Sequence, residues 1–143
     1  MSDITLIINE VNAITSTDDE KQLWQLGYAL ERFFELPDAA NHLEVWFRLF
    51  ERFPEDDGYE SFWSILHAIE AQKDYEQLVV ESVQRKPTRF PVLMLNRMVN
   101  AGQKYVGKVD ILRLLEDVAT DAKCLKSVCE DASFFLEHQR KKA

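Results

Sequence analysis

Residues that interrupt helices are scarce in this chain. Only four glycines and four prolines occur among its 143 residues. A chain of this length buries about two-thirds of its unfolded surface on folding, and 46% hydrophobic residues supply material for a core. Helices joined by short connections are therefore expected, and global disorder is not. We expect a single helical domain over residues 1–143.

Histidine and cysteine are also few. The three histidines and two cysteines match no recognised zinc-cluster spacing. Cys124 and Cys129 lie five residues apart on one predicted helix, where their side chains would point to different faces. A disulfide between them is therefore not expected. We expect neither a metal nor another cofactor.

Long apolar segments are absent as well. The sequence has no run of eighteen apolar residues and no charged-then-apolar leader at its start. Those features mark membrane spans and signal peptides. We therefore expect a cytoplasmic protein with no membrane partner.

Charge is distributed unevenly along the chain. Residues 1–83 carry 18 acidic and 5 basic side chains, a formal charge of −13, whereas residues 84–143 carry 7 and 12, a charge of +5. Nucleic-acid-binding proteins usually present a basic face, so the acidic first part argues against contact with phosphate. It favours a basic protein partner, or it serves only to keep the domain soluble.

Apolar residues recur at three- and four-residue spacing through most of the chain, which is the pattern of amphipathic helices. Short joints would pair these helices into antiparallel hairpins, and about forty residues per pair is close to HEAT-type repeats. We expect an all-α fold, either an irregular HEAT-like solenoid or a helical bundle, and no strand. The predicted helices cover residues 3–14, 18–35, 39–53, 59–72, 75–85, 91–102, 108–120 and 121–138.

Polar residues near the helix ends suggest how the helices begin and stop. Thr17 with Glu20, and Asp57 with Glu60, have the spacing of capping boxes for the second and fourth helices. Gly102 is placed to end the sixth helix in a left-handed conformation.

The helical pattern also assigns side chains to the core or to solvent. Trp24 and Leu125 are placed on buried faces, and Glu51 in solvent. Asn96 and Asn100 lie one turn apart on a mostly apolar helix. They are expected to bond backbone groups of neighbouring helices, with ligand-binding amides as the alternative.

Acidic residues gather at two joints between helices. Those at the start of the second helix also suit the helix dipole, which by itself accounts for them. The joint at 55–58 carries three consecutive acids where capping needs one, so the surplus is available to a positively charged partner. The predicted partner-binding residues are Asp18, Asp19, Glu20, Glu55, Asp56, Asp57 and Glu60.

Three segments resemble a known family: ERFPEDDGYE at 51–60, FWSILHAIE at 62–70 and DYEQLVVESVQRKPTRFPVLMLNRMVNAG at 74–102. They are similar to small helical immunity proteins encoded beside bacterial polymorphic toxins of the contact-dependent growth inhibition and Rhs type. The likeness rests on Trp63, His67, the joint at 87–91 and the run LNRMVNAG as a series. It implies a non-enzymatic inhibitor that binds one cognate toxin domain and protects the producing cell. Many such toxins are nucleases with basic surfaces, to which an acidic first part would be complementary.

Other functions remain open. A helical-repeat adaptor for another protein would share the fold and the acidic surface. An enzyme would need more than His67 beside Glu70 or Glu60, because no nucleophile, metal set or phosphate loop accompanies them. A nucleic-acid-binding module would have to use the basic residues of the second part, and salt-dependent retention would reveal it. Those residues are Arg85, Lys86, Arg89, Arg97, Lys104 and Lys108.

Overall fold

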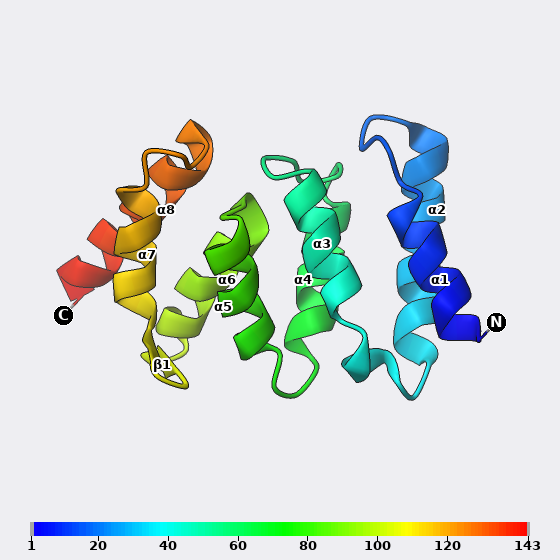
Figure 1. Ribbon diagram of the computed structural model, residues 1–143, viewed down its shortest axis with the longest axis horizontal. Helices are drawn as coiled ribbons and strands as arrows, with labels where there is room; N and C mark the ends of the chain where they lie inside the picture. The colour runs from blue at the N-terminus through cyan, green and yellow to red at the C-terminus, as the bar shows by residue number, and fades with distance from the viewer. Residues whose placement is uncertain (1, 143) are drawn as a thin grey trace. The chain divides into compact units, whose positions relative to one another are not determined.

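The periodic apolar segments fold into eight α-helices in the computed structural model, which describes residues 2–142 (Figure 1). This confirms the all-α fold class. A 3-10 helix, Ala39–Asn41, separates the second and third α-helices. The α-helices are α1 (Asp3–Asn12), α2 (Glu20–Glu35), α3 (Glu44–Arg52), α4 (Ser61–Glu70), α5 (Glu76–Arg85), α6 (Arg89–Asn100), α7 (Ile111–Ala119) and α8 (Lys126–Lys142).

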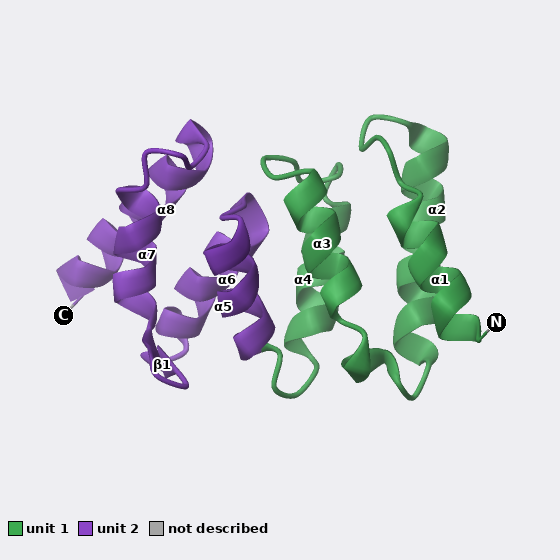
Figure 2. Ribbon diagram, in the orientation of Figure 1, with its two compact units in different colours: residues 1–75 green, residues 76–143 purple. Residues whose placement is uncertain are grey.

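The chain divides into two compact units, Met1–Tyr75 and Glu76–Ala143 (Figure 2). Unit 1 contains α1 to α4, and unit 2 contains α5 to α8. Unit 1 carries 16 acidic and 5 basic residues, a formal charge of −11, whereas unit 2 carries 9 and 12, a charge of +3. The change in charge along the sequence therefore follows the structural division.

Aromatic side chains make the core of unit 1. Helix α1 packs on α2 and α3, and α2 also packs on α4. The Phe33 ring meets the Trp46 ring edge-on at 5.2 Å between centroids, and Phe50 meets Phe62 in the same way at 5.2 Å. Such pairs contribute about 0.5–1.5 kcal/mol beyond their buried area. All four rings are fully buried, and the Phe50–Phe62 pair joins the end of α3 to the start of α4, on either side of the acidic joint at 55–58.

Two charged residues near the end of α3 make contacts that differ from those of a solvated side chain: Glu51 is buried and Arg52 bonds the end of α1. Glu51 is only 7% exposed and its carboxylate lies 3.5 Å from the Arg48 guanidinium, so the prediction that Glu51 faces solvent was wrong. Arg52 donates to the carbonyl oxygens of Val11 at 3.0 Å and Ile14 at 3.2 Å. Val11 lies in the last turn of α1 and Ile14 follows the helix, so Arg52 bonds carbonyls at its C-terminal end, where such groups need partners from outside the helix. Burial lowers the pKa of Arg52, and its guanidinium joins α3 to the end of α1.

Unit 2 is built from two helical hairpins. Helix α5 packs on α6, α7 packs on α8, and α6 contacts both helices of the second hairpin. Helix α6, which is mostly apolar in sequence, has seven buried residues. Gly102 follows the helix with φ +93°, as predicted for a left-handed helix end.

Side-chain amides join α6 to α8. Gln139, which is 7% exposed, donates through Nε2 to the Oδ1 atoms of Asn96 at 2.8 Å and Asn100 at 2.7 Å. Asn100 also accepts from the Lys142 ammonium at 3.2 Å. The sequence predicted bonds from both asparagines to backbone groups. They bond side chains of α8 instead, because the close packing of α6 and α8 buries Gln139 against them.

A short antiparallel hairpin precedes α7, so the prediction of no strand was wrong. Strand β1 (Tyr105–Val106) pairs with β2 (Val109–Asp110), with Val106 opposite Val109. Gly107 opens the two-residue turn with φ +57°. A two-residue loop that contains glycine between β-branched residues is a hairpin signal. These strands delay the start of the seventh helix to Ile111.

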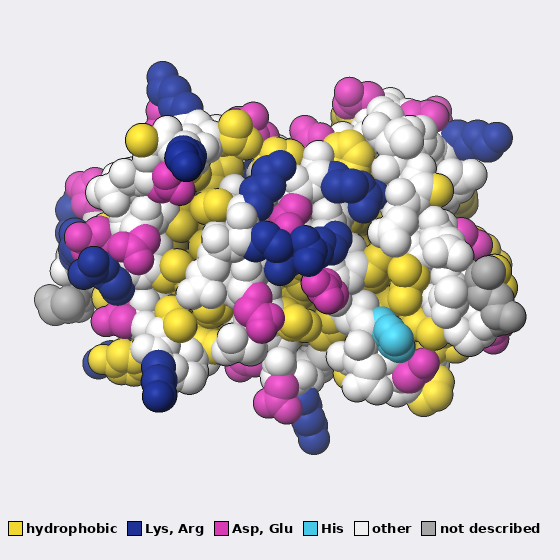
Figure 3. Space-filling model, in the orientation of Figure 1, with side chains coloured by type: hydrophobic (Ala, Val, Ile, Leu, Met, Phe, Trp, Pro, Cys, Tyr) yellow, Lys and Arg dark blue, Asp and Glu magenta, His cyan; other side chains and the backbone are white. Residues whose placement is uncertain are grey.

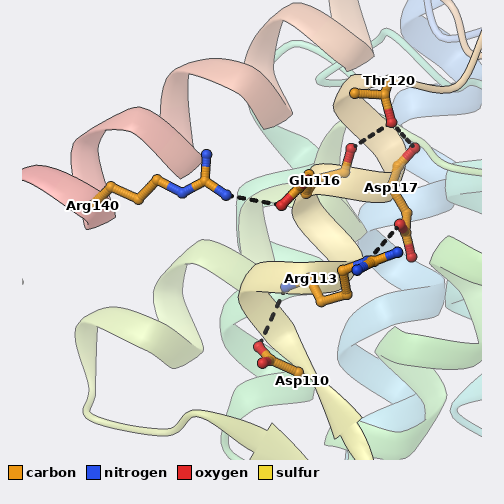
Figure 4. Close-up of polar contacts among 6 residues, drawn as sticks. All are labelled: Asp110, Arg113, Glu116, Asp117, Thr120 and Arg140. Carbon is orange, nitrogen blue, oxygen red and sulfur yellow. Dashed lines mark hydrogen bonds and ion pairs between the residues drawn. The ribbon is translucent and has the colours of Figure 1, made fainter.

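The first turn of α7 offers a test of local stability (Figure 4). The Asp110 carboxylate accepts from the Arg113 backbone N–H at 3.3 Å and caps the helix. We expect Asp110→Ala to lower the free energy of unfolding by about 1 kcal/mol, because one amide at the helix start loses its acceptor. Asp110→Ser should retain most of the stability. Urea unfolding followed by circular dichroism measures both, and equal stability of the alanine variant and the native protein would contradict the capping role.

Candidate partner-binding surface

Two acidic joints meet at one end of unit 1. The joint between α1 and α2 and the joint between α3 and α4 lie at the same end (Figure 1). The Thr17 hydroxyl donates to the Asp56 carboxylate at 2.7 Å across 39 positions of sequence. In Figure 3 acidic side chains line the upper edge of unit 1, over both joints. We call the seven predicted residues the acidic edge: Asp18, Asp19, Glu20, Glu55, Asp56, Asp57 and Glu60.

Three carboxylates of the acidic edge hold the fold. Asp19 caps α2 by accepting from the Lys21 backbone N–H at 3.0 Å. Asp57 accepts from the Tyr59 backbone N–H at 3.1 Å, and Asp56 accepts from Thr17. A partner therefore meets these carboxylates with part of their hydrogen-bonding capacity already used.

Three other carboxylates are exposed and unpaired. The side chains of Asp18, Glu20 and Glu60 make no hydrogen bond or ion pair within residues 2–142. Glu55 is also exposed, next to Asp56. The carboxylates of Asp18, Glu20 and Glu60 provide negative charge that no ion pair within residues 2–142 neutralises.

Both predicted capping boxes were wrong. Helix α2 begins at Glu20 with Asp19 as its cap, because the Thr17 hydroxyl is taken by Asp56. Helix α4 begins at Ser61, and Glu60 occupies the cap position without a side-chain hydrogen bond to the helix. The periodic spacing located these helices, but a long-range contact and a turn determined how they begin.

The turn before α4 is strained. Gly58, Tyr59 and Glu60 adopt φ values of +57°, +47° and +73° in succession. The left-handed region costs a residue with a side chain about 1–2 kcal/mol. Strain of this kind persists where the surrounding structure imposes it, and it is concentrated at functional sites. Here the turn holds Tyr59 on the surface, where 70% of the residue is exposed.

Beside the acidic edge lies an open groove of about 440 Å³, which we call the aromatic groove. It shares Glu20 with the acidic edge and Tyr59 with the small hollow around Asp18, Asp56 and Asp57. The edge and the groove are therefore one continuous surface of unit 1. The groove is lined by Glu20, Leu23, Trp24, Gly27, Tyr28, Glu31, Tyr59 and Ser61.

Trp24 is the main aromatic residue that the sequence analysis misplaced. It was predicted to be buried, but it is 76% exposed. The buried face of α2 carries Leu26, Ala29 and Phe33. Trp24 precedes Leu26 by two residues, which is about 200° around a helix, so it faces away from the core. The spacing of Trp24 and Tyr28, four residues apart and off the Leu26 face, was the signal for an exposed aromatic pair.

The charged residues that line the groove are all acidic. Glu20 and Glu31 line it, and none of its lining residues is basic. The Arg32 guanidinium lies 4.3 Å from the centre of the Tyr28 ring and also pairs with Glu10. The ring of Tyr28, which lines the groove, is therefore already in contact with a guanidinium of the same chain.

The histidine considered for catalysis, His67, lies on the surface beside Glu70. The His67 side chain is 61% exposed on α4, with Nδ1 4.0 Å from the Glu70 carboxylate. Within residues 2–142 no three histidine, cysteine or acidic side chains are grouped to hold a metal ion. Neither arrangement provides a nucleophile with its base.

The two cysteines are free, as predicted, but their side chains lie together and not on different faces. Cys124 lies in the turn before α8, which begins only at Lys126, and its thiol interacts with that of Cys129. Burial is the main reason that the pKa of Cys124 is raised to about 11, and the nearby negative charges of Cys129 and Asp121 raise it further. The Cys124 thiol is therefore protonated at neutral pH and is not an activated nucleophile.

Comparison with models of protein families, with curated proteins and with solved structures gave no match. Among the helices of residues 2–142, none has the length and apolar character needed to cross a membrane. The structural support for a function therefore comes from the chemistry of the acidic edge and the aromatic groove.

Proposed function

We propose that this chain is an immunity protein that binds a cognate toxin domain and neutralises it in the cytoplasm of the producing cell, without enzymatic activity of its own. One observation supports a binding role above the others. Exposed aromatic residues and unpaired carboxylates form a single surface on unit 1. The toxin as partner follows from the resemblance of residues 51–60, 62–70 and 74–102 to immunity proteins.

The two parts of this surface suit different steps of binding. Tryptophan and tyrosine are enriched among the residues that contribute most binding energy in protein interfaces. Trp24 and Tyr59 are 76% and 70% exposed and would lose water on docking. The carboxylates of the acidic edge would attract a basic partner during diffusion and disfavour acidic ones. A basic toxin, such as a nuclease, has the complementary charge.

Growth rescue tests this function. The toxin domain encoded beside this chain would be expressed with and without it, and the purified pair would be titrated. We expect rescue and a dissociation constant of about 1 nM or less. Trp24→Ala should weaken binding by at least about 30-fold, as for a central interface residue. Phe134→Ala is the matched control, because Phe134 is 67% exposed on α8 in unit 2.

The possible outcomes separate the candidate functions. Absence of rescue would contradict the immunity role. Capture of a basic host protein that depends on Trp24 would then assign an adaptor role. Steep salt-dependent retention on RNA or DNA would instead indicate a nucleic-acid-binding module.

A further inference from the structure

One of the positions that line the aromatic groove has no side chain. Gly27 lies in α2 among the lining residues, and a Cβ built on it would meet no atom within 4 Å. The groove is therefore open above Gly27, with Trp24 and Tyr28 one turn of helix apart beside it. A side chain from a partner would meet no side chain of Gly27 itself at this point of the groove.

The walls of the groove carry unused interaction sites. The rings of Trp24 and Tyr59 make no ring-stacking or cation–π contact within residues 2–142. The carboxylates of Glu20 and Glu31 are exposed and form no ion pair within that range. Flat aromatic faces beside unpaired carboxylates fit a planar cation.

We propose that the aromatic groove binds an arginine side chain of the protein partner. The guanidinium would stack on an exposed ring of the groove, Trp24 or Tyr59, and donate to the Glu31 carboxylate, while Glu20, about 16 Å away along α2, adds negative charge. Arginine fits better than lysine because its head group is planar, more weakly hydrated and forked. Arg32 on the Tyr28 ring shows the same combination inside the chain, since that guanidinium contacts both a ring and a carboxylate. This inference rests on the proposed function, because the arginine belongs to the protein partner that the proposed function requires.

Short peptides test this proposal without the toxin. The probes are Ac-Gly-Arg-Gly-NH2 and the matching peptides with lysine, leucine or glutamate at the centre. The readout is the indole N–H resonance of Trp24 in proton–nitrogen spectra, with buried Trp46 as the internal reference. We expect a saturable shift with the arginine peptide and binding at least about threefold tighter than with lysine. A leucine peptide that binds as tightly as arginine, or no shift with arginine, would overturn the proposal.

Two variants keep the test independent of folding. Gly27→Leu would fill the groove in a helix where leucine is preferred to glycine, so the urea midpoint should not fall. It should weaken binding of the arginine peptide by at least about tenfold, as expected when the space is occupied. Glu31→Gln keeps the size of the side chain and removes its charge, and it should reduce the preference for arginine over leucine. An unchanged affinity and preference in both variants would overturn the proposal.

The outcomes for the proposal and for the function are separable. Rescue of growth without arginine-peptide binding would remove this inference and leave the immunity role. Arginine-peptide binding without rescue would keep the arginine site and remove the immunity role.

Discussion

Reversing the three unpaired carboxylates of the acidic edge should slow association with a basic partner by about 10- to 100-fold at low salt. The variant combines Asp18→Lys, Glu20→Lys and Glu60→Lys. These side chains make no hydrogen bond or ion pair within residues 2–142, so the fold should tolerate the change. Reversal of Asp56 is avoided because its carboxylate accepts from Thr17 at 2.7 Å. Association rates measured across a salt series would show the loss, which should shrink as salt screens the charges.

A second triple variant controls for net charge. Glu81→Lys, Glu130→Lys and Glu137→Lys in unit 2 also change the formal charge from −8 to −2. Glu130 and Glu137 take part only in exposed ion pairs with Lys126 and Lys141, and such pairs contribute little to stability. We expect a much smaller change in association rate for this control. Equal slowing by both triples would mean that net charge matters and the acidic edge does not.

Replacing Gly58 by alanine should destabilise unit 1 by about 3 kcal/mol, for two separate reasons. Gly58 has φ +57°, which penalises any residue with a Cβ. A Cβ there would also lie 2.9 Å from Cδ1 of Phe62, which is fully buried and packed against Phe50. Crowding of a packed core typically costs about 1–3 kcal/mol. Urea unfolding followed by circular dichroism measures the effect.

Gly27→Ala is the matched control for that substitution. It makes the same chemical change in the same unit, but within α2 and with no atom within 4 Å of the new methyl group. Alanine is favoured over glycine in helices, so stability should rise by about 0.5–1 kcal/mol. The two substitutions should therefore have opposite signs. A Gly58→Ala variant as stable as the native protein would show that the backbone at 58–60 can change conformation at little cost in free energy.

The helices were predictable because apolar periodicity reports burial directly. The positions of all eight α-helices followed from it, although their ends shifted by several residues. Trp24 was misplaced because an apolar side chain was assumed to face the core, whereas α2 buries a face centred on Leu26, Ala29 and Phe33. The hairpin at 105–110 was missed because strands of two residues are too short to show an alternating pattern.

The acidic edge was predictable as a set of residues but not as a surface. Composition located both acidic joints, and surplus charge at 55–57 suggested contact with a partner. That the joints meet depends on the contact between Thr17 and Asp56, which no local pattern encodes. The aromatic groove depends likewise on a left-handed turn at Tyr59, a conformation that residues with side chains seldom adopt.

The division of roles within the acidic edge has an evolutionary consequence. Asp19, Asp56 and Asp57 are tied to the backbone or to Thr17, so changing them would cost stability as well as contact. Asp18, Glu20 and Glu60 carry no such bond within residues 2–142 and can be exchanged singly at little cost to folding. Mutations at these three positions would let a lineage follow a partner whose surface drifts, while the three tied carboxylates preserve the shape of the two joints.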